Sequence, residues 1–141
     1  MLKAMQLSAK AEYACLAMIE LAARHADPRP VRLLEIAEKH RIPQRFLVQI
    51  LLQLKGAGLV LSTRGSSGGY HLARPPEDIS LADVLGIVER IEPPLLPADA
   101  TPAAIALHGV WLRIHQARLD LLTTTTLADL VEAGHGLQYV I

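Results

Sequence analysis

The chain has 141 residues, of which 51% are hydrophobic and 20% charged, and its formal net charge is zero. This composition predicts a globular chain with its own core and excludes wholesale disorder, because disordered chains combine low hydrophobicity with high net charge. Only 4% of the residues are aromatic, so the core is expected to be aliphatic. The charge is unevenly divided, since residues 1–75 hold 11 Lys/Arg and 5 Asp/Glu, whereas residues 76–141 hold 3 and 9. A basic half favours contact with a polyanion.

No segment has the features of a signal peptide or a membrane span. Lys10 and Glu12 interrupt the first apolar stretch, and the uncharged run 100–112 is too short to cross a bilayer as a helix. We therefore expect a cytoplasmic protein without a membrane partner. Cys15 is the one cysteine of the chain, so no internal disulfide is expected. Its place on an apolar helix row predicts a small core residue, and the alternative is a thiol that senses oxidation.

Hydrophobic periodicity predicts two helices at the start of the chain, over residues 8–25 and 33–40. The segment 27–30 contains two prolines and separates them. A third helix is expected from Pro43, at its first position, to about Lys55. Its buried face is predicted to comprise Phe46, Leu47, Ile50, Leu51 and Leu54. The three-residue connection between the second and third helices is typical of a helix-turn-helix.

The hydrophobic period then changes from helical to alternating. Residues 59–63 and 70–73 predict two strands, joined by the glycine-rich loop 64–69. A helix-turn-helix followed by a β-hairpin is a winged helix. The predicted fold class is therefore mainly α with a small β-hairpin, and residues 1–78 are expected to form a winged helix-turn-helix DNA-binding domain.

Residues 79–141 are expected to form a linking helix, a dimerisation helix and a short C-terminal helix. Ser80 and Asp83 resemble a capping box that opens a helix to about Ile91. A long helix is predicted over 102–122, and a short one over 127–133 is expected to precede a flexible tail.

The predicted long helix carries apolar residues in the four-three alternation of a coiled-coil seam. The seam comprises Ala103, Leu107, Val110, Ile114, Ala117 and Leu121, and Trp111 widens it. Such a broad apolar stripe needs more cover than the first domain can give. We expect this helix to pair with a second copy of the chain, and the alternative is a helix that packs back on its own domain.

Two groups of residues are candidates for DNA contact. In a winged helix, Pro43, Gln44 and Arg45 would begin the helix that enters the major groove, where Gln pairs with adenine and Arg with guanine. Arg64 on the narrow loop suits an A/T-rich minor groove. Phosphate contacts are expected from Gly65, Ser66, Ser67 and the amides of the loop glycines. The alternatives are solvated polar residues and a plain hairpin turn.

Several segments of the chain resemble one known family. These segments are residues 7–14, 35–37, 46–51, 58–60, 64–75 and 126–131. They resemble the bacterial winged-helix regulators of the IscR, NsrR and CymR family, and the resemblance covers nearly the whole chain. It implies a homodimer that binds a palindromic promoter site, usually as a repressor, with Arg64 in the minor groove.

The sequence departs from this family in one place. Cluster-binding members carry three cysteines in the loop before the dimerisation helix, but residues 93–106 contain none. His108 lies where one cluster-binding branch has a histidine ligand, and a lone imidazole cannot hold an iron–sulfur cluster. We therefore expect no cofactor and no metal site, with His108 as a surface or interface residue.

The sequence favours a transcriptional regulator whose partners are double-stranded DNA and a second copy of the chain. The alternative is a winged-helix protein-interaction module whose activity is set by a partner protein or a small metabolite. No enzyme is expected, because the loop 65–69 leads into a strand, whereas a phosphate-binding loop opens a helix. The sequence does not identify an effector. Three possibilities stay open: constitutive repression, a small molecule in the cleft between head and long helix, and control by another protein.

Overall fold

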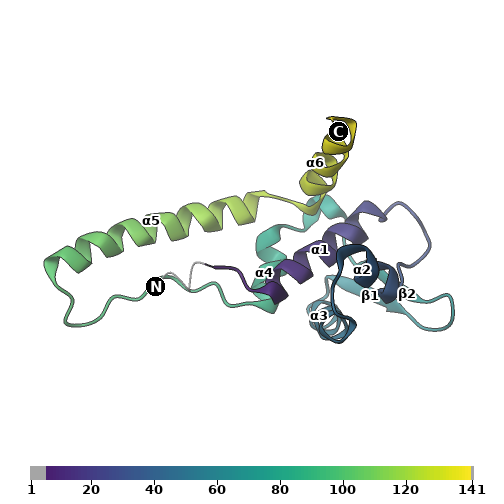
Figure 1. The fold of residues 1–141 in the computed structure, drawn as a ribbon, viewed down its shortest axis with the longest axis horizontal. Helices are drawn as coiled ribbons and strands as arrows, with labels where there is room; N and C mark the ends of the chain where they lie inside the picture. Colours follow the sequence, from purple (N-terminus) through teal and green to yellow (C-terminus); the bar gives the residue numbers. More distant parts are fainter. Residues whose placement is uncertain (1–5, 141) are drawn as a thin grey trace.

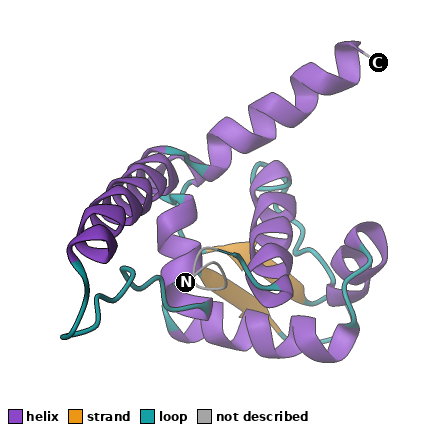
Figure 2. Ribbon diagram, turned by 60° about the vertical axis from the view of Figure 1, so that its left-hand side comes forward, coloured by secondary structure: helices purple, strands orange, loops and turns teal. Residues whose placement is uncertain are grey.

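The computed structural model describes residues 6–140, and their elements follow the order of a winged helix. The elements are α1 (Ala9–Ala23), α2 (Leu33–His40), α3 (Gln44–Gly56), β1 (Val60–Thr63), β2 (Gly69–Leu72), the 3-10 helix η2 (Pro76–Asp78), α4 (Leu81–Val88), α5 (Pro102–Thr124) and α6 (Leu127–Val140). In Figure 1, α1 to α4 and the hairpin form a head from which α5 projects. Figure 2 shows the two strands, in orange, beside the helices of this head. No helix in the described part of the chain is long and apolar enough to span a membrane.

The turn between α2 and α3 is as tight as the sequence predicts. Arg41 adopts the left-handed conformation with φ 54°, and the Ile42 N–H donates to the Ala37 carbonyl at 2.9 Å. Pro43 is the N-cap of α3, so its predicted place as the first helical residue is wrong by one position. Its ring fixes φ at −58° at the entry into the helix, and its carbonyl accepts from the Leu47 N–H at 3.1 Å.

The core is aliphatic, as expected, and α1 lies at its centre. The largest fully buried side chains include Met18, Leu21, Ile36, Leu47, Ile50, Leu51 and Leu54. The same hydrophobic cluster contains Ile79, Val84 and Leu127, so it extends past residue 78 into α4 and α6. Phe46 does not join it, which corrects the predicted buried face of α3. Its side chain is 42% exposed, and the guanidinium carbon of Arg45 lies 4.9 Å from the ring centroid.

The junction between α5 and α6 is bonded to the start of α4. The Leu81 N–H donates to the Thr125 carbonyl and the Leu127 N–H to the Ile79 carbonyl, both at 2.9 Å. Ser80 and Asp83 form the predicted capping box, although α4 ends at Val88, earlier than expected. These two backbone hydrogen bonds flank one isolated antiparallel bridge, Ser80 to Thr126, and hold the base of α5 to the head.

Both C-terminal helices are longer than predicted. α5 includes Thr123 and Thr124, because their hydroxyls donate to the carbonyls of Leu119 and Asp120, one turn earlier, at 2.7 and 2.8 Å. α6 extends to Val140, so the predicted end before Gly134 is wrong. A glycine lowers helix stability by about 1 kcal/mol, and it ends a helix only where capping hydrogen bonds replace the helical ones.

A buried carboxylate joins α1 to α2. Glu20 is 5% exposed, and its Oε1 lies 2.9 Å from His40 Nε2 and 3.0 Å from Lys39 Nζ. Burial alone raises the pKa of Glu20, but the hydrogen bonds from His40 and Lys39 outweigh it and leave that pKa below its usual value. The ionised form therefore stabilises the fold at neutral pH.

We expect Glu20→Gln to lower the free energy of unfolding by about 1–3 kcal/mol at pH 7, because a charged hydrogen-bond acceptor is lost from a buried position. Since folding lowers the pKa of Glu20, this stabilisation is present above the carboxyl's unfolded pKa and is lost as the pH falls through the folded value. Urea unfolding at pH 7 and at lower pH measures both effects. Glu38→Gln, an exposed neighbour on α2, is the control. Equal losses in the two variants would contradict the role of Glu20.

Candidate nucleic-acid interface

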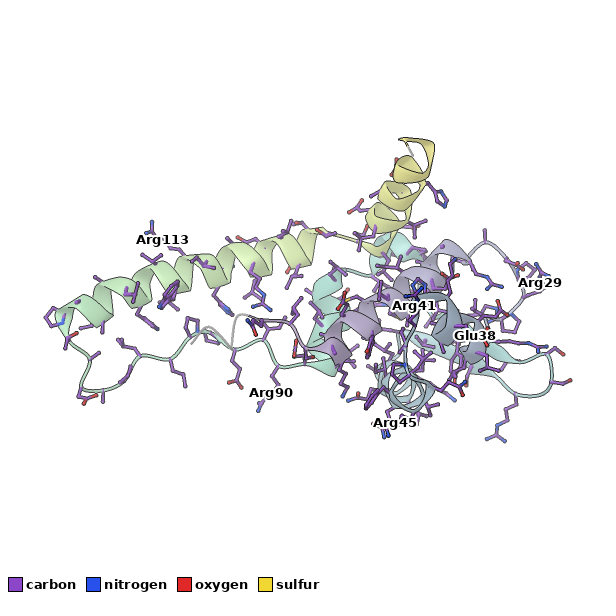
Figure 3. All side chains as sticks on the ribbon, in the orientation of Figure 1. Arg29, Glu38, Arg41, Arg45, Arg90 and Arg113 are labelled. Carbon is purple, nitrogen blue, oxygen red and sulfur yellow. The ribbon has the colours of Figure 1, made fainter. Side chains whose placement is uncertain are left out.

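The side of α3 opposite the core is exposed. Pro43, Gln44 and Arg45 are exposed at its start, as predicted, and Figure 3 shows Arg45 extending outwards from the helix. The exposed stripe continues along the helix from Arg45 through Val48, Gln49 and Leu52. Val48, Gln49 and Leu52 were not among the predicted contact residues, although their spacing from Arg45 of three, four and seven places them on one helix face. This face offers polar groups for base edges and aliphatic groups for thymine methyls.

The wing is the loop 64–68 between β1 and β2. Arg64, Ser66 and Ser67 are exposed, and Gly65 has φ +105°, a conformation that other residues rarely adopt. In the described part of the chain, the Arg64 side chain has no hydrogen bond or ion pair. The Gly68 N–H donates to the Gly65 carbonyl at 3.0 Å, so this amide is not available for the phosphate contact that the sequence suggested.

The wing and α3 share one rigid support. The strands pair antiparallel with Val60 opposite Leu72 and Thr63 opposite Gly69. Leu59 and Val60, which connect α3 to the hairpin, are buried in the same core as α3. The head therefore holds the two candidate DNA-contact elements in a fixed relation.

The charge of this part of the head is largely unneutralised. Exposed basic side chains here that form no ion pair with any described residue include Arg41, Arg45, Lys55, Arg64 and Arg74. Such cations are available to replace the counterions of a nucleic acid.

Helix α5 leaves its apolar seam uncovered. No residue of α5 is buried, and Leu107, Val110, Ile114 and Leu121 are between 38% and 67% exposed. Ala117 is also exposed, whereas Trp111 is half-buried. The arrangement differs from a helix that packs back on its own domain, because α5 touches the head chiefly near α4 and otherwise projects from it (Figure 1).

Comparison with known proteins agrees with this geometry. The family model Rrf2, described as an iron-dependent transcriptional regulator, matches residues 7–133. The chain belongs to the Rrf2 family of transcriptional regulators. It is similar to the HTH-type transcriptional regulator CymR of Bacillus subtilis, with 37% identity over 135 residues that make up 95% of each chain.

Solved structures of Rrf2-type regulators have the same fold. The structure of B. subtilis CymR, described as the global cysteine regulator, matches with a TM-score of 0.82 and 36% identity over 91% of this chain and 97% of CymR. The T. potens IscR structure gives a TM-score of 0.80 and 33% identity over 94% of this chain and 90% of IscR. The predicted winged-helix fold and DNA-binding regulatory function are thus confirmed, while the individual contact residues stay predictions.

The Rrf2 family model is described as iron-dependent, but the donor set of this chain does not fit an iron–sulfur cluster. Cys15 is the only thiol in the sequence, and no three His, Cys, Asp or Glu side chains gather among the described residues. His108 Nε2 lies 2.8 Å from the Pro94 carbonyl oxygen, so its ring ties the loop 89–101 to α5.

Cys15 lies at the edge of the core rather than within it. Burial, and then the negative charges of Glu12 and Glu89, raise the pKa of its thiol to about 11. The thiol is therefore protonated at neutral pH and is a weak nucleophile.

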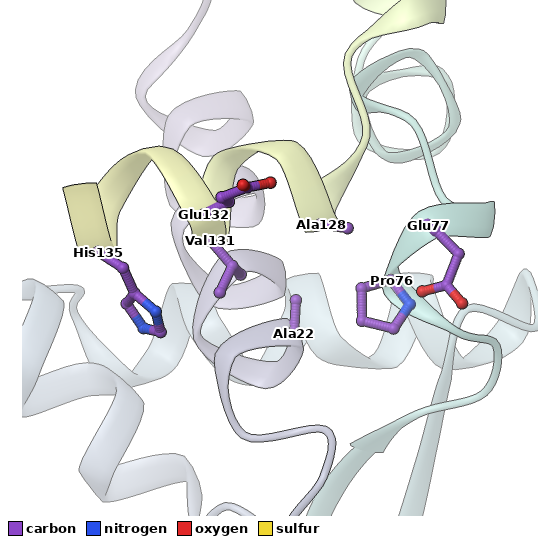
Figure 4. Close-up of a pocket in the computed structure, with 7 residues that line it drawn as sticks. All are labelled: Ala22, Pro76, Glu77, Ala128, Val131, Glu132 and His135. Carbon is purple, nitrogen blue, oxygen red and sulfur yellow. The ribbon is translucent and has the colours of Figure 1, made fainter.

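Two pockets lie where α6 meets the head. One of about 400 Å³, between α1, α4, α5 and α6, is lined by Leu7, Glu12, Cys15, Ile19, Leu81, Leu85, Leu122 and Leu130. Figure 4 shows the other, of about 260 Å³, which is lined by Ala22, Pro76, Glu77, Ala128, Val131, Glu132 and His135. The pocket of about 400 Å³ lies between the head and α5, where a small-molecule effector was one of the predicted possibilities.

Proposed function

We propose that this chain is a sequence-specific repressor that binds a palindromic DNA site as a homodimer. The observation that carries the proposal is that one hydrophobic core supports both an exposed α3 face and the wing, whose Arg64 side chain has no partner among residues 6–140. The arrangement suits α3 in the major groove and the wing over the neighbouring minor groove or backbone.

The residues divide by the kind of contact that their chemistry allows. Gln44 and Arg45 present hydrogen-bond donors to base edges from the first turn of α3, and Pro43 sets the start of that turn. Arg64 presents a guanidinium to the minor groove. Ser66, Ser67 and the Gly65 backbone lie beside Arg64 and suit phosphate contacts, which position the protein without reading sequence.

The uncovered seam of α5 supports the homodimer. A helix with an exposed apolar stripe in four-three alternation is stabilised by a second helix of the same pattern. A two-fold dimer presents two wings and two α3 helices about one DNA turn apart, which corresponds to a palindromic site.

Selection from a pool of random-sequence duplexes tests the proposal. The full chain should enrich a palindrome with half-site centres about 10 base pairs apart, and its binding should weaken steeply as salt rises. Enrichment of single half-sites would contradict the dimer. Binding that is absent at low salt would contradict DNA recognition and favour the alternative of a protein-interaction module.

A further inference from the structure

The base of the wing is held by backbone contacts to the segment before α2. Val31 and Tyr70 exchange two hydrogen bonds, from the Val31 N–H at 2.9 Å and from the Tyr70 N–H at 2.8 Å. Gly69 lies so close that a Cβ atom there would meet the Val31 carbonyl oxygen at 2.5 Å. These contacts fix β2 but do not reach the wing loop.

One side chain spans from this segment to the wing loop. Arg32 Nη2 donates to the Ser66 carbonyl at 2.7 Å, across 34 positions of sequence. Within residues 6–140, no other hydrogen bond joins residues 64–67 to a part of the chain outside the hairpin. Arg32 is also the N-cap residue of α2, where its carbonyl accepts from the Ile36 N–H at 3.3 Å, so its backbone belongs to the helix-turn-helix while its side chain bonds to the wing.

We propose that Arg32 is a positioning residue that holds the wing so that Arg64 is presented at a fixed place relative to α3. The inference rests on the proposed DNA-binding function. A loop that is already ordered loses less conformational entropy on binding than a free one. Because the donor is charged, its hydrogen bond to the Ser66 carbonyl is stronger than one between neutral groups.

Trypsin cleavage of the free protein tests the structural part, because the Arg64–Gly65 bond lies in the wing itself. We expect Arg32→Ala to raise the cleavage rate at this bond about fivefold, the factor that one net hydrogen bond contributes to an opening equilibrium. Arg32→Gln keeps an N–H donor on a shorter side chain without the charge, so its cleavage rate should fall between those of wild type and Arg32→Ala. Arg29→Ala is the matched control, because Arg29 pairs with Asp27 and makes no hydrogen bond to the wing. An unchanged cleavage rate in Arg32→Ala would overturn the proposal.

DNA binding tests the functional part, with the most enriched selected duplex as probe. If Arg32 acts through Arg64, Arg32→Ala weakens binding in the wild type but adds little in an Arg64→Ala background. If Arg32 instead contacted a phosphate directly, Arg32→Ala would weaken binding equally in both backgrounds and would reduce the salt slope by about 1 per lost contact. Arg32→Gln would then weaken binding as much as Arg32→Ala. That result would overturn the positioning role. If the wild type binds no duplex, the proposed function fails, and the cleavage experiment still decides how the wing is held.

Discussion

Arg64→Ala is expected to weaken binding to the selected palindrome by about 5- to 150-fold, because a guanidinium in a groove contributes about 1–3 kcal/mol. The side chain stands exposed on a narrow loop beside Gly65. It forms no bond within the described chain that DNA would first have to break. Its contribution to binding is therefore not offset by a lost internal contact. Fluorescence anisotropy with a labelled duplex at two salt concentrations measures the loss.

Two further variants separate charge from shape at this position. Arg64→Lys keeps the charge but lacks the planar guanidinium. We therefore expect this variant to keep most of its affinity for DNA but to lose more of its preference for A/T-rich sequence beside the half-site. Arg90→Ala removes the same charge from an exposed residue after α4 that pairs with Glu92, away from the wing. Equal effects of Arg64→Ala and Arg90→Ala would show that only net charge matters.

Ile114→Glu is expected to convert the proposed homodimer to a monomer. Ile114 lies in the middle of the α5 seam and is 39% exposed in the single chain. In a paired helix its side chain would be covered, and two facing carboxylates there would cost several kcal/mol through desolvation and like-charge repulsion. Loss of the second half-site would then lower DNA affinity by about 100-fold or more, because simultaneous binding of two sites is lost.

Light scattering coupled to size-exclusion chromatography, across a range of protein concentrations, measures the change in mass. Gln116→Glu adds the same charge on α5, two positions from Ile114 and off the seam, and should stay dimeric. Circular dichroism should show that both variants keep their helices. A dimeric Ile114→Glu protein would mean that the α5 seam is not the interface.

The sequence predicted the elements whose signals are local. The bounds of α2 and the Ser80–Asp83 capping box follow from short-range spacing, and the structure has both. Phe46 was wrongly predicted to be buried, because hydrophobic periodicity gives the buried face of a helix only to within one position. Phe46 lies at the margin of the buried face of α3. The end of α6 was misplaced because glycine weakens a helix without necessarily stopping it.

The candidate interface was predicted only where residue type and spacing suffice. Pro43, Gln44, Arg45 and Arg64 could be proposed because each stands at a recognisable point of a motif. The contact from Arg32 to the Ser66 carbonyl joins residues 34 positions apart and has no sequence signal. It depends on how the hairpin folds back over the start of α2, which only the packed structure gives.

The bonded junction at the base of α5 has a mechanical consequence for the proposed dimer. Because Leu81 and Leu127 join this junction to the head by backbone hydrogen bonds, each head and its α5 move as one lever. A helix of 23 residues is about 34 Å long. If two such helices cross near Ile114, about 15 Å from the base of α5, a 10° change in the crossing angle would displace that base by ~3 Å, close to the rise of one base pair. In the proposed dimer, a small rearrangement at the seam would therefore shift both α3 helices relative to their half-sites.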